Sequence, residues 1–289
     1  MLPMGAILPA SPDAYKSLLM MLMGLGMGHA LKRMLVGTSA GRAAMALRNA
    51  YQFWQLPRVE YGTLVNDQIA IQLAVGLCPP SGTFVDIGAH IGSVISEVHF
   101  RHPGARIVAF EAIPEKAAAL QRKFPGYEVH NLALWDREGE ASFFVDVEHS
   151  ASSSLARGTA EAREIRVRTR RLDSLFADRG ADVLKVDVEG AELGVFRGAT
   201  ELIGRSRPIM MFESGPGVIF DFTKEAMFAF LTEQNYAIVA PNRLAHTGGR
   251  MTLDAFLDSH EYPRRTTNYF ALPIEREQQI REAARSIKF

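Results

Sequence analysis

The chain has 289 residues, of which 47% are apolar and 22% are charged, and this composition excludes a disordered or collagen-like protein. The 32 Lys and Arg residues equal the 32 Asp and Glu residues in number, so no global excess of positive charge is present to hold a nucleic acid. The single cysteine, Cys78, excludes an internal disulfide and a cysteine-based zinc site. It also indicates a reducing compartment, and we expect a cytoplasmic protein.

The longest uncharged run covers residues 17–31, is rich in Leu, Met and Gly, and is followed by Lys32 and Arg33. A helix of this length spans about 22 Å, which is short of the ~30 Å hydrocarbon core of a membrane. The positive flank follows the apolar run, which is not the order in a signal peptide. We expect residues 1–60 to form a helical appendage. Its residues 18–31 would pack on the protein body, form a homo-oligomer contact or touch a membrane surface.

From residue 81 onward, short β-branched or aromatic runs alternate with helical stretches, which predicts an α/β fold with a mostly parallel sheet. The predicted strands cover 83–87, 106–110, 128–132, 183–188, 209–213, 237–240 and 268–272. The predicted helices cover 92–101, 114–124, 191–203 and 223–234. The segment 141–172 breaks this rhythm and predicts a two-stranded insertion from 142–147 and 165–171. Its alternate arginines, Arg166, Arg168 and Arg170, suit the solvent-exposed face of a strand.

The first predicted strand runs into the pattern Asp86-x-Gly88-x-x-x-Gly92 and then into a helix. Glycine lets backbone N–H groups approach a ligand closely at a helix N-terminus. His90 stands where a dinucleotide motif has its second glycine, so a nicotinamide cofactor is not favoured. Asp86 could instead accept a hydrogen bond from the ammonium group of an amino-acid-like cofactor. The other interpretation is a tight turn with no ligand.

Glu111 ends the second strand, where an acidic side chain can accept the hydroxyls of a ribose. Alone, it could equally be a favourable charge at the N-terminus of the next helix. After the third strand, Asn131 and Ala133 are candidates to flank an adenine, although loop or capping roles explain them as well.

The fourth strand carries Lys185, Asp187 and Glu189 on alternate positions, so these side chains project to one side near its carboxyl end. Open α/β sheets assemble their active sites at that edge. The alternative is an ion-pair network that closes the strand end. Glu213 places one more carboxylate at the end of the neighbouring strand.

Taken together, these motifs resemble the FkbM family of methyltransferases. The motifs occur in order as Asp86-x-Gly88-x-x-x-Gly92, Phe110-Glu111-x-x-Pro114, Asn131-x-Ala133, the serines of 152–154, Leu172-Asp173, and Lys185-x-Asp187-x-Glu189-Gly190-Ala191-Glu192. The resemblance implies a class I methyltransferase fold, which is a Rossmann-like, seven-stranded, mostly parallel sheet with flanking helices. It also implies S-adenosylmethionine as cofactor and O-methylation as reaction. The family commonly has Asn where this chain has His90.

The resemblance also implies roles for the candidate residues. The predicted cofactor-binding residues are Asp86, Gly88, His90, Gly92, Glu111, Asn131, Ala133 and Asp187. The predicted catalytic residues are Asp187, Glu189, Lys185 and His90. Asp187 and Glu189 are the preferred bases for an acceptor hydroxyl, and His90 and His130 are reserves because imidazole has the better starting pKa. A carboxylate at its ordinary pKa of ~4 is a weak base, so this role requires a raised pKa.

We therefore predict a helical appendage over 1–60 and a methyltransferase domain over 61–289, with an insertion at about 141–172. The predicted reaction is O-methylation of a hydroxyl on a small molecule, a sugar or a lipid-linked glycan. Nothing in the sequence identifies the acceptor, and we expect no nucleic-acid partner and no resident metal. One alternative is a catalytically inactive S-adenosylmethionine-binding assembly protein. The other is a metal-assisted enzyme acting on a diol, with Mg²⁺ held by Asp187 and Glu213.

Overall fold

The computed structural model describes residues 35–44, 46, 61–145, 163–215, 222–261 and 264–288. The chain divides into two units, Met1–Pro57 and Arg58–Phe289. In the first unit, residues 39–44 are helical, and Thr38 caps this helix because its Oγ1 accepts a hydrogen bond from the Gly41 N–H at 2.9 Å. The stretch 18–31 lies outside the described residues, so its predicted contacts, and the domain boundary at 60, stay predictions.

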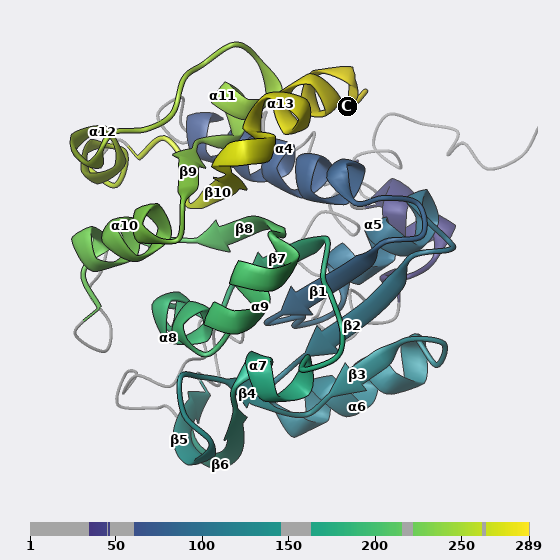
Figure 1. The fold of residues 1–289 in the computed structure, drawn as a ribbon. Coiled ribbons are helices and arrows are strands. Elements are labelled where there is room, and N and C mark those ends of the chain that lie inside the picture. The colour runs from purple at the N-terminus through teal and green to yellow at the C-terminus, as the bar shows by residue number, and fades with distance from the viewer. Residues whose placement is uncertain are drawn as a thin grey trace, which may run out of the picture. The chain divides into compact units, whose positions relative to one another are not determined.

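A seven-stranded sheet in the order β3-β2-β1-β7-β8-β10-β9 forms the centre of the second unit (Figure 1). The strands are β1 (Thr83–Ile87), β2 (Arg106–Phe110), β3 (Glu128–His130), β7 (Val183–Val186), β8 (Ile209–Glu213), β9 (Tyr236–Val239) and β10 (Asn268–Pro273). Neighbours from β3 to β8 pair in parallel, whereas β10 is antiparallel to both β8 and β9. The predicted α/β class with a seven-stranded, mostly parallel sheet is therefore confirmed.

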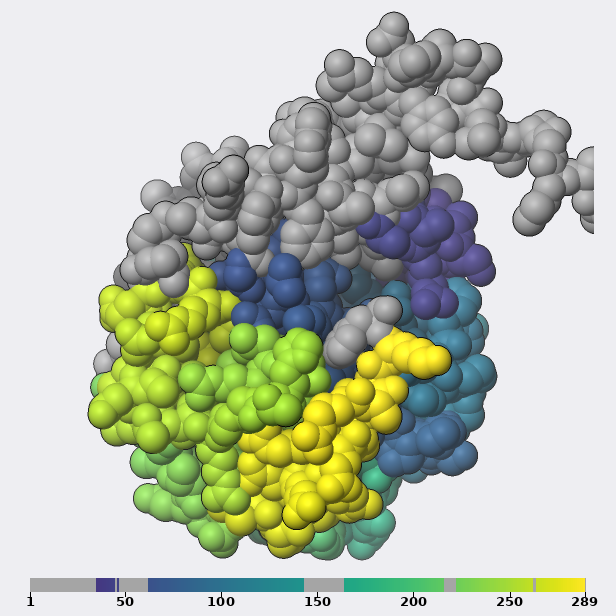
Figure 2. All heavy atoms as spheres, turned by 90° about the horizontal axis from the view of Figure 1, so that it is seen from above, coloured from purple at the N-terminus to yellow at the C-terminus, as the bar shows by residue number. Residues whose placement is uncertain are grey.

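Helices cover both faces of this sheet, which explains why its central strands are apolar along their whole length. The helix α4 (Tyr61–Leu77) packs on β7, β8 and β10, and α5 (Ser93–Arg101) packs on β1. The short helix α11 (Pro241–Ala245) and the C-terminal helix α13 (Glu277–Ser286) pack on α4, and Figure 2 shows α13 in yellow at the surface of this side.

A hydrophobic core of the described residues lies between the sheet and the helices of its other face. It combines alternate strand residues, such as Val85 and Leu184, with Phe196 of α8 (Glu192–Arg197), Leu202 of α9 (Thr200–Ser206) and Leu231 of α10 (Lys224–Glu233). The remaining described helices are α6 (Pro114–Lys123), α7 (Leu172–Leu175), α12 (Leu253–Asp258) and the 3₁₀ turn η2 (Ile274–Arg276). Among the described helices, none has the length and apolar character needed to cross a membrane.

The predicted insertion is present as a second, three-stranded sheet in the order β4-β6-β5. Strands β5 (Gly139–Val145) and β6 (Arg163–Arg170) pair antiparallel, as expected, and the two-residue strand β4 (Ala133–Leu134) adds in parallel to β6. Arg166 and Arg168 are exposed as predicted, whereas Arg170 is half-buried and pairs with Glu138 at 3.0 Å.

Three predicted elements differ from the structure. The predicted strand 183–188 stops at Val186, so Asp187 and Glu189 lie in the loop after it and not on alternate positions of a strand. The predicted strand 128–132 stops at His130, because the next residues leave this sheet and the chain joins the second sheet at β4. The predicted helix 191–203 is two helices, α8 and α9, which are separated at Gly198. Gly198 lies so close to Trp135 that an added Cβ would overlap the Trp135 carbonyl oxygen, so there is no room for a side chain where the two helices meet.

Candidate active site

A cavity of about 320 Å³ lies at the carboxyl ends of β1, β2 and β7. This volume is at the lower end of the range for small-molecule sites. Its walls include most of the predicted site residues, namely Gly88, His90, Glu111, Ala133, Lys185, Asp187 and Glu189. Asp86, Gly92 and Asn131 are not among its lining residues, and their role toward the cofactor stays a prediction.

The glycine loop between β1 and α5 has left-handed backbone at three positions, with φ of 80° at Gly88, 50° at His90 and 84° at Gly92. Gly88 leaves no room for a side chain, because an added Cβ would overlap the carbonyl oxygen of Asp187. A Cβ on Gly92 would lie 2.6 Å from Phe124 Cε2. Gly92 is the N-cap of α5, so it shapes the turn behind the cavity and not the cavity wall. The loop therefore needs glycine for two different close approaches.

Glu111 connects the glycine loop to the end of β2. Its Oε2 accepts a hydrogen bond from the His90 N–H at 2.8 Å, and its Oε1 accepts one from the Ile113 N–H at 2.9 Å. Burial raises the pKa of the Glu111 carboxyl, although the hydrogen bond from Ile113 and the charge of Lys116 oppose this shift. A carboxylate has about four lone-pair sites, so each oxygen retains the capacity to accept a ligand hydroxyl.

Asn131 supports this wall from behind. Its Nδ2 donates to the carbonyl oxygens of Glu111 at 2.9 Å and Ala112 at 2.8 Å, so the side chain fixes the backbone after β2. Ala133 itself lines the cavity. The reserve base His130 lies elsewhere, stacked on the Phe110 ring and 2.7 Å from Glu128 Oε1. Sequence reasoning missed Lys116, a buried cavity residue on α6 whose charge acts on Glu111.

Lys185 is the charged centre beneath the cavity, with only 5% of its side chain exposed. Its ammonium donates to the Gly88 carbonyl at 2.8 Å and forms ion pairs with Asp86 at 3.2 Å and Asp187 at 3.3 Å. Burial alone would lower the pKa of Lys185, but the charges of Asp187 and Asp86 outweigh it and raise this pKa above its ordinary value. Asp86 is completely buried, so it lies behind the wall, on the far side of Lys185.

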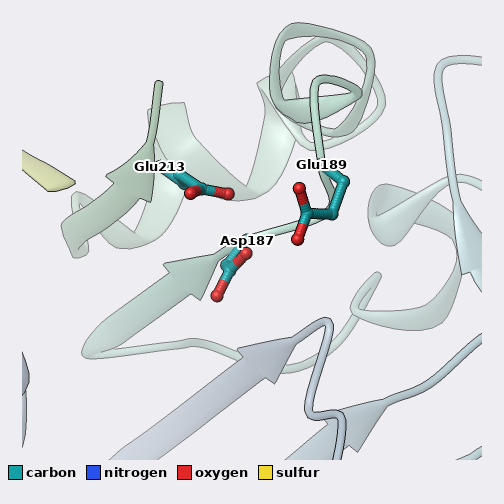
Figure 3. A group of neighbouring side chains, drawn as sticks. All are labelled: Asp187, Glu189 and Glu213. Carbon is teal, nitrogen blue, oxygen red and sulfur yellow. The ribbon is translucent and has the colours of Figure 1, made fainter. Parts of the chain in front are cut away.

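Three carboxyl groups gather at the other end of the cavity, and we refer to Asp187, Glu189 and Glu213 as the carboxyl cluster. Figure 3 shows these side chains turned toward one another from the ends of β7 and β8 and the loop after β7, and one oxygen from each lies within 4.8 Å of the others. Asp187 and Glu189 line the cavity. The side chain of Asp187 is 39% exposed, because it faces the open cavity.

The members of the carboxyl cluster differ in acidity. Burial and the adjacent charges of Asp187 and Glu192 raise the pKa of Glu189 to about 7. Burial and the charges of Asp187 and Glu189 raise the pKa of Glu213 to about 10. Burial also acts to raise the pKa of Asp187, but the Lys185 charge and a hydrogen bond from Glu213 keep it below its ordinary value. At neutral pH, Glu213 is therefore protonated, Asp187 is ionised and Glu189 is poised between the two forms.

Glu192 positions the loop that carries Glu189. Its Oε1 accepts hydrogen bonds from the Val188 N–H at 3.0 Å and the Gly190 N–H at 3.1 Å. Glu189 itself has φ of 55°, which is uncommon for a residue with a side chain. Such local strain persists only where the surroundings hold it in place, and it is typical of functional loops. Glu192, the last residue of the predicted motif, therefore holds this loop in place.

The carboxyl cluster also includes the pair expected in the metal-assisted alternative, Asp187 and Glu213. Carboxylate oxygens are suitable ligands for Mg²⁺. However, a proton on Glu213, hydrogen-bonded to Asp187, relieves the repulsion within the cluster without an ion. This alternative is therefore not favoured.

Asn268, also missed from the sequence, lines the cavity beside Ile71 of α4 and Met211 of β8. Its Nδ2 donates to Asp67 Oδ1 at 2.9 Å, which orients the amide. Because β10 is antiparallel, its first residue lies at the edge where its parallel neighbours end. Recognition of this strand as antiparallel would have placed Asn268 at the site from the sequence.

A comparison with known proteins gives the family of the chain. The model of the methyltransferase FkbM domain matches residues 86–238, which is more than half of the chain. AMB antimetabolite synthetase AmbE from Pseudomonas aeruginosa is 30% identical over 165 residues, which cover 42% of this chain and 8% of AmbE. Methyltransferase 1 from Beauveria bassiana is 25% identical over 163 residues, which cover 46% of this chain and 66% of that protein. The chain thus spans less than two thirds of either relative.

Among solved structures, methyltransferase FkbM from Methylobacillus flagellatus is similar, with a TM-score of 0.45 and 16% identity over 84% of this chain and 57% of that chain. The match to the family model includes the glycine loop, Glu111, Lys185 and the carboxyl cluster. The family expected from the motifs is confirmed, and with it the cofactor that the family uses, S-adenosylmethionine. The chain belongs to the FkbM family of methyltransferase domains.

Proposed function

We propose that this protein transfers the methyl group of S-adenosylmethionine to a hydroxyl oxygen of a small molecule, a sugar or a lipid-linked glycan. One observation supports this function above the others. A carboxyl group with its pKa raised to about 7, that of Glu189, stands in the same cavity wall as a glycine loop and a buried acidic side chain at the end of β2. The first feature suits proton removal, and the others suit a nucleoside cofactor with an amino-acid part.

The described residues fit this cofactor. The Glu111 carboxylate has lone pairs free for the ribose hydroxyls, and the backbone of 88–92 presents a glycine turn to the methionine part. Ala133 and its apolar neighbours Leu132 and Ile113 offer a wall for the adenine. When bound, S-adenosylmethionine supplies an electrophilic methyl group on a positively charged sulfur. We infer that Asp86 and Asn131 act indirectly, by holding Lys185 and the backbone after β2.

In this proposal Glu189 is the general base. An effective catalytic base has a pKa near the operating pH, because it must be ionised and still basic enough to take a proton. Glu189 meets both conditions at about 7, whereas Asp187 is held below its ordinary pKa by Lys185 and is a weaker base. Glu189 takes the proton of the acceptor hydroxyl as the methyl group passes from sulfur to oxygen. Asp187 then serves as a fixed negative charge, and His90 contributes its backbone N–H to the glycine loop.

The acceptor would enter the end of the cavity formed by Ile71, Met211 and Asn268. The Asn268 amide is oriented by hydrogen bonds from its Nδ2 to Asp67 and Thr267, and in this proposal its Oδ1 accepts a hydrogen bond from the acceptor. A cytoplasmic location, and oligomer or membrane contacts through residues 18–31, stay part of the proposal.

Calorimetric titration tests the function directly. We expect S-adenosylmethionine and S-adenosylhomocysteine to bind and NADH not to bind. Transfer of labelled methyl groups to an acceptor from a cell extract should follow, and it should survive thorough chelation of divalent metals. Binding without transfer to any extract component would favour an inactive binding protein. Absence of binding by both cofactors would refute the proposal.

A further inference from the structure

Negative charge around the cavity exceeds the positive charge that compensates it. The Lys185 ammonium divides its two ion pairs between Asp86 and Asp187. Within the described part of the chain, no ion pair reaches Glu189, Glu213 carries a proton, and Lys116 is the other lysine of the cavity wall. The wall between β7 and β8 is thus short of a positive partner.

Asp86 gives an independent indication of the same imbalance. It is completely buried, and among the described residues neither of its carboxylate oxygens has a well-directed hydrogen bond. Its compensation is the charge of Lys185, which it shares with Asp187. Buried carboxylates normally have a partner of their own, so a site that maintains this excess is suited to a ligand that brings a positive charge.

We propose that the carboxyl cluster distinguishes the methyl donor from the spent cofactor by charge: the cationic sulfonium binds with displacement of a proton from the cluster, whereas the neutral thioether does not. This inference rests on the proposed function. The donor and the product share their adenosine, ammonium and carboxylate groups and differ at the sulfur, which has lost its methyl group and its charge in the product. The carboxyl cluster is therefore a determinant of donor specificity.

The groups that face the cluster are compatible with this exchange. Those acting on its members are Lys185, Lys116, His90, Glu192 and Asp67. The pKa of Glu189 at about 7 makes it the member that changes its protonation most readily at neutral pH. One positive charge about 6 Å from a carboxyl lowers its pKa by about 2 at the effective dielectric constant of a protein site. A shift of that size converts a half-protonated Glu189 into an ionised one.

This exchange would prepare the base only when the donor is present. Binding of the donor to the protonated cluster releases one proton to solvent and leaves an ionised Glu189 beside the sulfonium. After transfer the sulfur is neutral, and Glu189 has gained the proton of the acceptor hydroxyl. The cluster then returns to its protonated form with the product still bound, so the electrostatic attraction for the cofactor ends with the reaction.

The test is isothermal titration calorimetry of the full chain with S-adenosylmethionine and with S-adenosylhomocysteine, in buffers with different ionisation enthalpies. The dependence of the observed enthalpy on buffer gives the number of protons released. At pH 7 we expect the donor to release about half a proton more than the product, because a group with pKa of about 7 is half protonated there. Between pH 6 and pH 8, the preference for the donor should rise about tenfold.

Variants locate the source of the proton. In Glu189→Gln, the donor should no longer release more protons than the product, and most of the pH dependence of the preference for the donor should disappear. In the matched control Glu233→Gln, at an exposed site on α10, both should stay as in the wild type. Equal proton numbers for the two cofactors in the wild type would overturn the inference and leave the proposed function intact. Failure of both cofactors to bind would instead refute the proposed function. The wild-type comparison decides the question even if Glu189→Gln does not fold.

Discussion

Replacement of Lys185 by methionine is the most direct test of how this site is held together. The substitution keeps the length of the side chain and removes the charge between Asp86 and Asp187. Removing one partner of a buried ion pair costs about 3–5 kcal/mol, because the remaining charge stays buried. Without Lys185, the charge of Asp86 stays completely buried, whereas the carboxylate of Asp187 is 39% exposed and can be solvated by water. The lower end of that range therefore applies. Loss of the hydrogen bond to Gly88 adds about 1 kcal/mol.

We therefore expect the free energy of unfolding of Lys185→Met to fall by about 4 kcal/mol at pH 8, measured by urea denaturation. The loss should become smaller toward pH 5. Without Lys185, the pKa values of the Asp86 and Asp187 carboxyls rise in the folded state, so folding takes up protons and is favoured as the pH falls. The matched control is Lys288→Met at an exposed position, which should unfold like the wild type.

A loss of less than 1 kcal/mol in Lys185→Met would refute this account, because it would mean that Asp86 needs no charged partner. A loss that is the same at pH 5 and pH 8 would also contradict it. The double variant Asp86→Asn with Lys185→Met separates the two carboxylates. It should regain stability relative to Lys185→Met alone, since a neutral amide replaces the unpaired buried charge.

Three further predictions concern individual residues. Glu189→Gln should lower kcat by about 10²–10⁴-fold and remove the rise of kcat/KM through pH 7 in a methyl-transfer assay. Gly88→Ala, whose Cβ would overlap the Asp187 carbonyl at a φ of 80°, should lower both cofactor affinity in calorimetry and the melting temperature, whereas Gly126→Ala, in open space, should change neither. Glu128→Gln should lower the free energy of unfolding by about 1 kcal/mol at pH 7, and by less as the pH falls from 4.5 toward 2. The reason is that the arginine partners of Glu128 lower its pKa to about 2, and their stabilisation is lost when the carboxylate is protonated. Urea denaturation across this pH range measures the difference.

The central strands could be predicted because their residues are buried on both faces. Strands β1, β2 and β8 have the predicted bounds, and each is an almost continuous apolar run. The helix α4 could not be predicted in the same way. It lies between the sheet and the helices α11 and α13, so its apolar residues are distributed around it and leave no amphipathic stripe to recognise.

The residues of the site were predictable in kind, whereas their arrangement was not. Glycine spacing and strand-end carboxylates identify the loop 88–92, Glu111 and Asp187 from the sequence alone. Which carboxyl is the base depends on distances across the sheet. Burial and the charges of Asp187 and Glu192 raise the pKa of Glu189, whereas the charge of Lys185 holds the pKa of Asp187 below its ordinary value. The sequence pattern does not show this difference in pKa, because both carboxyl residues occur at alternate positions of one motif.

In the proposed function, the position of Lys185 connects the cofactor loop to the carboxyl cluster. Its ammonium contacts the carbonyl of Gly88 in the glycine loop and the carboxylate of Asp187 in the cluster. A displacement of the loop would therefore weaken the ion pair that keeps Asp187 ionised. The pKa of Glu189 responds to both members of that pair, since the charge of Asp187 raises it and the charge of Lys185 lowers it. A single buried lysine thus makes the basicity of Glu189 depend on a correctly formed cofactor loop, and a conservative exchange to arginine, with its larger planar group, would not reproduce this contact.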